Sequence, residues 1–177
     1  MDWIQLREKD LCGRELAGMT ARAMACAGSG TVILVNDRAD VACALGASGV
    51  HLGGRSLPPE EARRLASHCS AGKDFIVGVS AHSLEEAVQS EQAGADYVIF
   101  GPVFATPSKA GFGEPQGVPH LREVCERLTI PVLAIGGITL ENATDCFAAG
   151  AAGIAAIRLF QDAADLETLV KELRRDS

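Results

Sequence analysis

The chain has 177 residues, enough for one domain with a complete hydrophobic core. Its 22% of charged and 47% of hydrophobic residues are typical of a soluble globular protein, and no apolar run reaches the roughly 18 residues of a membrane span. The net charge of −7 argues against a nucleic-acid partner, although a local cluster of donors can still bind phosphorylated small molecules. The polar N-terminus lacks the apolar core of a secretory signal, which favours a cytoplasmic protein without membrane contact.

Short apolar runs rich in Val, Ile and Leu alternate with Ala-rich amphipathic segments along the whole chain. Near-continuous apolar character is typical of parallel strands that are covered on both faces. The predicted strands are 3–7, 31–36, 49–53, 74–81, 97–104, 131–138 and 153–160. The predicted helices include 13–28, 58–69, 83–94, 118–128, 140–150 and 165–175.

Several local signals support these helices. Pro58 and Pro59 suit a helix start, and Ser83 with Glu86 forms the pattern of a capping box. Gly94 is typical of a helix C-terminal stop, as is Gly150.

The cysteines form no C-x-x-C pair, and most of them lie in Ala-rich helical stretches. We therefore expect buried, reduced thiols rather than a zinc site or a disulfide framework. The six are Cys12, Cys26, Cys43, Cys69, Cys125 and Cys146.

Strict alternation of strands and helices predicts an α/β fold with a parallel sheet. An open doubly wound sheet and a closed barrel both fit this alternation. Polar residues follow the strands, and in a barrel all of these loops open on one face, which favours the barrel. Seven strands are recognisable instead of eight. We therefore predict one domain over 1–177, a (β/α)8 barrel of the TIM type that lacks its first βα unit.

The polar residues after the first two strands could bind a phosphate or a metal. Arg7 can grip a phosphate with two parallel hydrogen bonds, and Lys9 supplies a point charge, unless both belong to a solvated loop. Asp37, which follows Asn36, could hold a divalent metal, or it could form an Asx turn or a helix cap.

Other candidates follow the later strands. Ser80 and His82 come after the fourth strand, where a lone histidine is more often structural. Gly136 and Gly137 could let backbone amides approach a phosphate, or could form only a tight turn. The long segment that contains Thr106, Ser108 and Lys109 has the residue types of an anion-binding loop, or of a flexible surface connection. Loops of this length in a compact domain are often functional.

The motifs occur in the order QLREK, VNDR, GVHLG, GVSAHS, ADYVIFGPVF, IPVLAIGGI and GAAGIA. In this order, over nearly the whole chain, they resemble thiamine phosphate synthase and the related thiazole tautomerase family. The resemblance implies a (β/α)8 barrel. It also implies a transferase that joins a hydroxymethylpyrimidine diphosphate to a thiazole phosphate and releases pyrophosphate, with Mg²⁺ assistance.

The resemblance also implies roles for individual residues. The residues expected to bind the pyrimidine diphosphate are Gln5, Arg7, Lys9, Asn36 and Ser80. Asp37 is expected to ligate Mg²⁺. The residues expected to cover the thiazole and the diphosphate are Thr106, Ser108 and Lys109. Those expected to hold the thiazole phosphate are Gly136, Gly137, Ile157 and Arg158. Catalysis is assigned to Lys109, Arg7 and Ser80.

The sequence departs from the family pattern at three places. Ser56 stands where the synthases carry a second metal-binding Asp, so we expect weak Mg²⁺ binding unless the substrate supplies most ligands. Pro102 stands where the tautomerases carry a histidine, which favours a synthase. The expected first strand is missing, which would expose strand edges. Three explanations of the missing strand stay open. The start is internal to a longer chain, another chain fills the gap in a homo-oligomer, or the sequence was trimmed.

Two alternatives to the synthase stay open at this point. The first is a tautomerase-like isomerase that uses His82 as its base. The second is a non-catalytic homologue that binds a thiamine precursor. It would keep the phosphate-binding residues and lose the metal site.

Overall fold

The structure, a computed structural model, describes residues 2–69, 72–106 and 114–174. Seven parallel strands alternate with helices, and the order of the strands in the sheet follows their order in the chain. This confirms the predicted α/β alternation with seven strands. The chain packs as two compact units, Met1–Val79 with Ala93–Asp96 and Ser80–Gln92 with Tyr97–Ser177. Whether they act as one domain stays a prediction.

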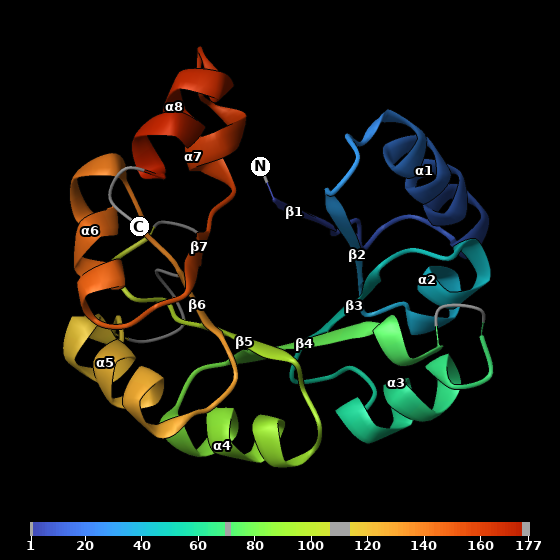
Figure 1. The fold of residues 1–177 in the computed structure, drawn as a ribbon, viewed down its shortest axis with the longest axis horizontal. Helices are drawn as coiled ribbons and strands as arrows, with labels where there is room; N and C mark the ends of the chain where they lie inside the picture. Colours follow the sequence, from blue (N-terminus) through green and yellow to red (C-terminus); the bar gives the residue numbers. More distant parts are fainter. Residues whose placement is uncertain (1, 70–71, 107–113, 175–177) are drawn as a thin grey trace. The chain divides into compact units, whose positions relative to one another are not determined.

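The first unit is a parallel ladder covered on one face by helices (Figure 1). Its strands are β1 (Trp3–Leu6), β2 (Val32–Asn36), β3 (Gly49–Leu52) and most of β4 (Ile76–Ala81). Its helices are α1 (Gly13–Cys26), α2 (Ala39–Leu45), α3 (Pro59–Ala66) and the short 3-10 helix η1 (Gly72–Asp74). The register of the ladder sets Gln5 opposite Leu34, and Asn36 opposite His51.

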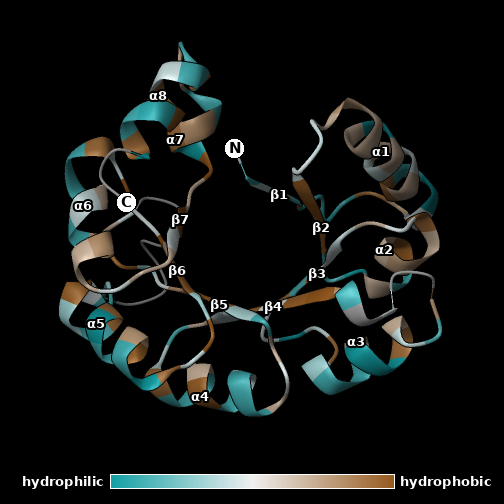
Figure 2. Cartoon of the chain, viewed as in Figure 1, coloured by the Kyte–Doolittle hydropathy of each residue, from teal (hydrophilic) through white to brown (hydrophobic). Residues whose placement is uncertain are grey.

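Branched and aromatic side chains of the strands pack against small side chains of the helices. Val35, Val50 and Val77 are fully buried, and Ala42 and Ala62 face them from α2 and α3. The alanines let the helices approach the sheet closely, and each buried valine contributes roughly 1.5–3 kcal/mol. Figure 2 shows the resulting pattern, with β2 and β4 largely hydrophobic and α3 carrying hydrophilic residues.

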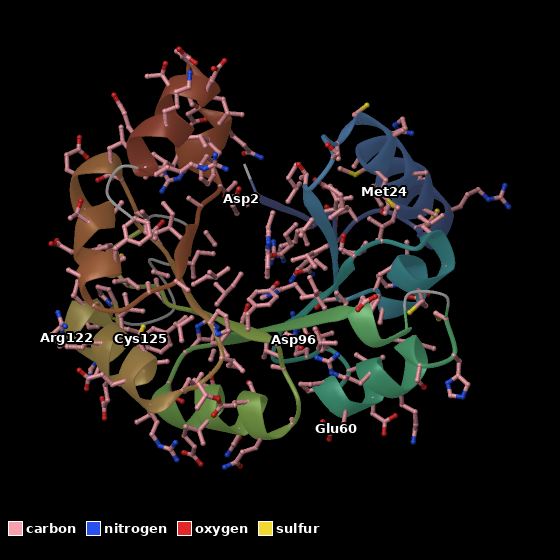
Figure 3. The ribbon with its side chains drawn as sticks, viewed as in Figure 1. Asp2, Met24, Glu60, Asp96, Arg122 and Cys125 are labelled. Carbon is pink, nitrogen blue, oxygen red and sulfur yellow. The ribbon has the colours of Figure 1, made fainter. Side chains whose placement is uncertain are left out.

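The second unit repeats this arrangement. Its strands are β5 (Tyr97–Phe100), β6 (Val132–Ile135) and β7 (Gly153–Ala155), which pair in parallel. Its helices are α4 (Leu84–Gln92), α5 (Gly117–Arg127), α6 (Leu140–Ala148), α7 (Arg158–Gln161) and α8 (Leu166–Leu173). Charged side chains of the helices point away from the strands, as Figure 3 shows for Arg122 of α5 and, in the first unit, for Glu60 of α3.

Three predicted strands are shorter than expected. The runs 97–104 and 131–138 are strands only over Tyr97–Phe100 and Val132–Ile135. The apolar run 153–160 is a strand only over Gly153–Ala155, and Arg158–Gln161 forms the short helix α7. The prediction was wrong there because a short apolar run reads the same whether it is a buried strand or one turn of a buried helix. Within the described ranges, no helix combines the length and apolar character needed to cross a membrane.

The local helix signals behave largely as predicted. Gly94 and Gly150 have φ values of 89° and 99°, the left-handed conformation of a helix stop. The Ser83 hydroxyl accepts a hydrogen bond from the Glu86 amide at 3.1 Å. The Glu86 carboxylate accepts from the His82 amide at 2.6 Å instead of from Ser83, so only half of the predicted capping box forms.

The cysteines are all free thiols, as predicted, but only Cys43 and Cys146 are buried, while Cys69 and Cys125 are partly exposed. Cys12 and Cys26 are exposed, because they lie at the two ends of α1 rather than on its packed face. Burial raises the pKa of Cys43 to about 12 and that of Cys146 to about 11. These two thiols therefore stay protonated at neutral pH and act as small apolar side chains.

Candidate functional site

Three of the predicted side chains of the first unit form one hydrogen-bonded cluster with Ser56. The amide of Gln5 donates through Nε2 to Oδ1 of Asn36 at 2.7 Å, and Nδ2 of Asn36 donates to Oδ2 of Asp37 at 2.7 Å. The Ser56 hydroxyl donates to the other carboxylate oxygen, Oδ1 of Asp37, and accepts from the Gly53 amide at 2.7 Å. We call Gln5, Asn36, Asp37 and Ser56 the carboxylate cluster.

Asp37 has an unusual backbone conformation. Its φ is 61°, and the Arg38 amide donates across it to the Asn36 carbonyl at 2.8 Å, which closes a three-residue turn. A non-glycine residue in such a turn is strained by roughly 1–3 kcal/mol, and such strain concentrates at functional sites. Arg38 is the N-cap residue of α2, and no side chain caps this helix, so Asp37 is not a helix cap.

Arg7 and Lys9 follow β1 and are exposed, as expected of side chains that meet a ligand or solvent. Arg7 is close enough to His51 to influence its charge. His51 is only 2% exposed, and burial lowers its pKa to about 4, opposed by the negative charge of Asp37 and helped by Arg7. The imidazole beside the cluster is therefore neutral at neutral pH.

His51 is a site residue that the sequence analysis did not select. It is the one polar side chain within the apolar run GVHLG, and every residue of β3 is buried. The signal that could have identified it is a polar residue within a buried apolar strand, because a buried imidazole needs a polar neighbour.

The donor set of the carboxylate cluster suits a hard cation such as Mg²⁺. Its groups are amide, hydroxyl and carboxylate oxygens, which Mg²⁺ prefers. Asp37 supplies the cluster's only carboxylate. In the part of the chain that the structure describes, no group of three or more His, Cys, Asp or Glu residues could hold a metal. The residues therefore fit Mg²⁺ where substrate phosphates supply most of the ligands.

In the second unit, the predicted glycines form the turn after β6. Gly136 and Gly137 have φ values of 99° and 65°. A Cβ on Gly136 would lie 2.5 Å from Cβ of Pro102, and one on Gly137 would lie 2.5 Å from the Ala105 carbonyl oxygen. Side chains at both positions are therefore excluded by packing. This fits a tight turn, and a phosphate role for these glycines stays a prediction.

Arg158 and Thr106 lie together. Nη2 of Arg158 donates to Oγ1 of Thr106 at 3.1 Å. Ile157, just before α7, is 58% exposed. A cavity of about 620 Å³ is lined by Arg158, Gly137 and Thr139, by apolar residues such as Leu159 and Leu169, and by the acidic residues Asp162, Asp165 and Glu172. This unit thus contains a cavity with a guanidinium and a glycine turn on its wall.

The remaining predicted residues are less well placed for catalysis or are not described. Ser80 is half-buried near the end of β4. His82 is exposed, and its Nδ1 is hydrogen-bonded to the Gly101 carbonyl, which can only accept, so this nitrogen carries the proton. Ser108 and Lys109 lie outside the described residues.

The chain is similar to a well-defined set of proteins. The model of the family described as thiamine monophosphate synthase matches residues 1–160. The thiamine-phosphate synthase of Methanocella arvoryzae is 44% identical over 174 residues, which is 98% of this chain and 80% of that protein. A putative thiamine-phosphate synthase of Geobacter sulfurreducens is 46% identical over 156 residues, which is 87% of this chain and 70% of that protein.

A solved structure agrees with these relatives. Thiamine phosphate pyrophosphorylase from Pyrococcus furiosus matches with a TM-score of 0.84 at 35% identity, over 99% of this chain and 82% of that one. This confirms the predicted α/β fold of the TIM type with one unit fewer. The chain belongs to the thiamine monophosphate synthase family.

Proposed function

We propose that this chain is a transferase that joins a hydroxymethylpyrimidine diphosphate to a thiazole phosphate and releases pyrophosphate. The observation that carries the proposal is the carboxylate cluster, which lies at the carboxyl ends of β1 and β2, and Arg7 and Lys9 follow β1 in the chain. Parallel α/β folds place their active sites at these strand ends. A relative that is 44% identical is named for this reaction.

The proposed chemistry needs charge neutralisation more than proton transfer. The bond between the pyrimidine methylene carbon and the diphosphate oxygen breaks, and the electron pair leaves with the diphosphate. The aminopyrimidine ring stabilises the cationic carbon, and the lone pair of the thiazole nitrogen then forms the new C–N bond. Arg7 and Lys9 stabilise the negative charge on the leaving oxygens, which is the main electrostatic task of the site.

Asp37 is the residue that would hold Mg²⁺, and the bound ion would supply additional positive charge next to the leaving diphosphate. Asn36 and Gln5 contribute by keeping the polar wall of the cluster rigid, since each is hydrogen-bonded to the next member. The neutral His51 beside the cluster adds no positive charge that would repel Arg7 or a cation at Asp37.

The second unit supplies the proposed thiazole phosphate site. Arg158 donates a hydrogen bond to Thr106, and Gly137 lies on the wall of the cavity that Arg158 also lines. An arginine can bind phosphate oxygens with two parallel hydrogen bonds. The roles of Ser80, Ser108 and Lys109 in holding the diphosphate are proposed from the family resemblance alone.

The tautomerase-like alternative has less support. His82 is exposed, and its Nδ1 is already bonded to the Gly101 carbonyl. Pro102, which stands where the tautomerases carry a histidine, packs against Gly136. The non-catalytic alternative, a chain that binds a thiamine precursor without converting it, is tested by the coupling assay.

The experiment is a coupling assay with the purified chain, both phosphorylated substrates and Mg²⁺, with thiamine phosphate measured by chromatography. We expect product, and we expect Arg158→Ala to raise the KM for the thiazole phosphate about tenfold or more because a charge-assisted contact is lost. Arg122→Ala, on the exposed face of α5, is the matched control. Tight binding of thiazole phosphate by the wild-type chain without any product would support the binding-protein alternative and overturn the proposal.

A further inference from the structure

We propose that Ser56 is a positioning residue that orients the Asp37 carboxylate toward a divalent cation bound to a diphosphate. The proposal rests on the proposed function for its diphosphate, but its argument comes from the hydrogen bonds around Asp37. The chemical class of the ligand is a hydrated divalent cation bridged to an inorganic or organic diphosphate.

The direction of the Ser56 hydrogen bond is determined by its neighbours. The hydroxyl accepts from the Gly53 amide at 2.7 Å, and a hydroxyl has only one proton to donate. That proton is directed to Oδ1 of Asp37, because a carboxylate oxygen can only accept. The loop after β3 thereby determines where one oxygen of the carboxylate lies.

The other carboxylate oxygen is held from the opposite side. Gln5 donates to Oδ1 of Asn36, so the amide of Asn36 must turn its Nδ2 toward Asp37. Each oxygen of Asp37 therefore accepts one hydrogen bond in the cluster. Since a carboxylate has about four acceptor sites, lone pairs remain for a cation.

The backbone of Asp37 makes this support necessary. Its φ of 61° is strained for a residue with a side chain, and such conformations persist only where surrounding contacts determine them. The Asp37 amide adds a further constraint by donating to the His51 carbonyl at 2.8 Å. Loss of the Ser56 hydroxyl would leave the carboxylate held on one side only.

A site with a single carboxylate, even a well-oriented one, should bind a divalent cation weakly unless another ligand contributes. Mg²⁺ keeps several waters and is often bound by one or two carboxylates together with substrate phosphates. We therefore expect this chain to bind a divalent cation weakly alone and more tightly with a diphosphate. The contribution of Ser56 should appear in the second case, when the cation, the diphosphate and Asp37 must align.

The test uses Mn²⁺ as a spectroscopic probe and inorganic pyrophosphate as the diphosphate. The dissociation constant of Mn²⁺ is measured by electron paramagnetic resonance with and without pyrophosphate, for the wild type, Ser56→Ala and Ser56→Thr. We expect Ser56→Ala to weaken binding with pyrophosphate by about tenfold, as losses of outer-shell partners do. Ser56→Thr keeps the hydroxyl and should stay within about twofold of the wild type.

The matched control is Ser48→Ala. The Ser48 hydroxyl also accepts from a backbone amide, that of Ile33 at 3.1 Å, but Ser48 lies before β3, at the other end of the strand from the carboxylate cluster. This control should lower the melting temperature without changing Mn²⁺ affinity. If Ser56→Ala binds Mn²⁺ and pyrophosphate as the wild type does, or if Ser48→Ala weakens binding equally, the inference is wrong.

The two proposals can fail separately. A wild-type chain that makes thiamine phosphate while Ser56→Ala keeps full Mn²⁺ affinity overturns only the inference about Ser56. A chain that makes no product, but whose Mn²⁺ affinity with pyrophosphate depends on the Ser56 hydroxyl, overturns only the proposed function.

Discussion

Asp37 combines a strained backbone with a carboxylate whose two oxygens both accept hydrogen bonds. A stability role alone would not require a carboxylate here, because asparagine also tolerates a positive φ. Charge and a second acceptor oxygen are thus the properties that distinguish Asp37 from asparagine. This makes the residue a good test of whether the cluster binds a cation.

We expect Asp37→Asn to lower coupling activity by on the order of 100-fold or more, since even outer-shell changes at metal sites cost 10- to 100-fold. The variant should remain folded, because asparagine fits the turn. Steady-state kinetics at several Mg²⁺ concentrations, together with thermal melting, would measure both effects. Asp40→Asn removes a neighbouring carboxylate whose ion pair with Arg38 is exposed, and it should stay within about twofold of the wild type. Full activity of Asp37→Asn would contradict the metal-binding role.

At the scale of elements, Arg63 connects α3 to two other segments of the first unit. Its guanidinium pairs with the Asp96 carboxylate and donates to the carbonyls of Gly94 at 3.1 Å and Phe75 at 3.0 Å. Asp96, labelled in Figure 3, also accepts from the Val77 amide at 2.7 Å. One arginine thus holds the residues before β4 and before β5 against one helix.

We expect Arg63→Ala to lower the free energy of unfolding by about 1–2 kcal/mol, because it removes the ion pair of one carboxylate and a hydrogen-bond donor to each of two carbonyls. Arg63→Lys should recover only part of this loss, since an ammonium cannot contact three separated acceptors as a planar fork does. Urea unfolding would measure the differences. The control is Arg64→Ala, whose ion pair with Glu61 is largely exposed and should be worth less than about 0.5 kcal/mol. Equal effects of the two variants would contradict the connecting role of Arg63.

Glu91 makes a similar connection in the second unit, and its contribution should depend on pH. Its carboxylate accepts from the Thr129 hydroxyl and amide, both at 2.7 Å, and from the Ile130 amide at 3.2 Å. The Thr129 hydroxyl is the largest cause that holds the pKa of Glu91 below its ordinary value. A lowered pKa in the folded chain stabilises it above the unfolded pKa, roughly 4.3, and this stability is lost as the pH falls through the folded pKa.

Glu91→Gln should therefore lower the melting temperature at pH 7, and the difference from the wild type should shrink as the pH falls from about 5 to about 3. Melting curves across this range would measure the effect. Glu85→Gln removes a charge from the same helix, α4, without these three bonds, and is the control. A difference between wild type and Glu91→Gln that does not change with pH would contradict the assignment.

At the scale of the whole molecule, the strand order leaves two terminal strands. Among the described residues, β1 has a strand partner on one side only, as does β7. Trp3 on β1 is 38% exposed. An open strand edge with an exposed aromatic side chain favours pairing with other chains.

We expect the purified chain to self-associate with increasing concentration, and we expect Trp3→Lys to reduce this, because a lysine on an edge strand opposes pairing. Light scattering coupled to size-exclusion chromatography would measure the mass distribution. Leu65→Lys, which changes a comparably exposed residue on α3, is the control and should leave association unchanged. Concentration-independent mass for the wild type would overturn this expectation.

Much of the fold followed from local patterns. The apolar runs and the Ala-rich segments predicted the positions of all seven strands, because period and composition reflect burial on both faces. The runs 97–104, 131–138 and 153–160 are longer than the strands they contain, since only tertiary packing decides where a short apolar segment leaves the strand conformation. The helix ends at Gly94 and Gly150 were predictable because glycine adopts the left-handed backbone conformation that ends a helix.

The sequence by itself determined the alternating α/β order and the kinds of residue at the strand ends, because both follow from neighbours along the chain. Only the tertiary structure decided that Ser56 donates to Asp37, that His51 is buried and neutral beside it, and that packing against Pro102 accounts for Gly136. These facts depend on contacts between segments far apart in the sequence. Such contacts form only when the strands pair in register, which no local pattern specifies.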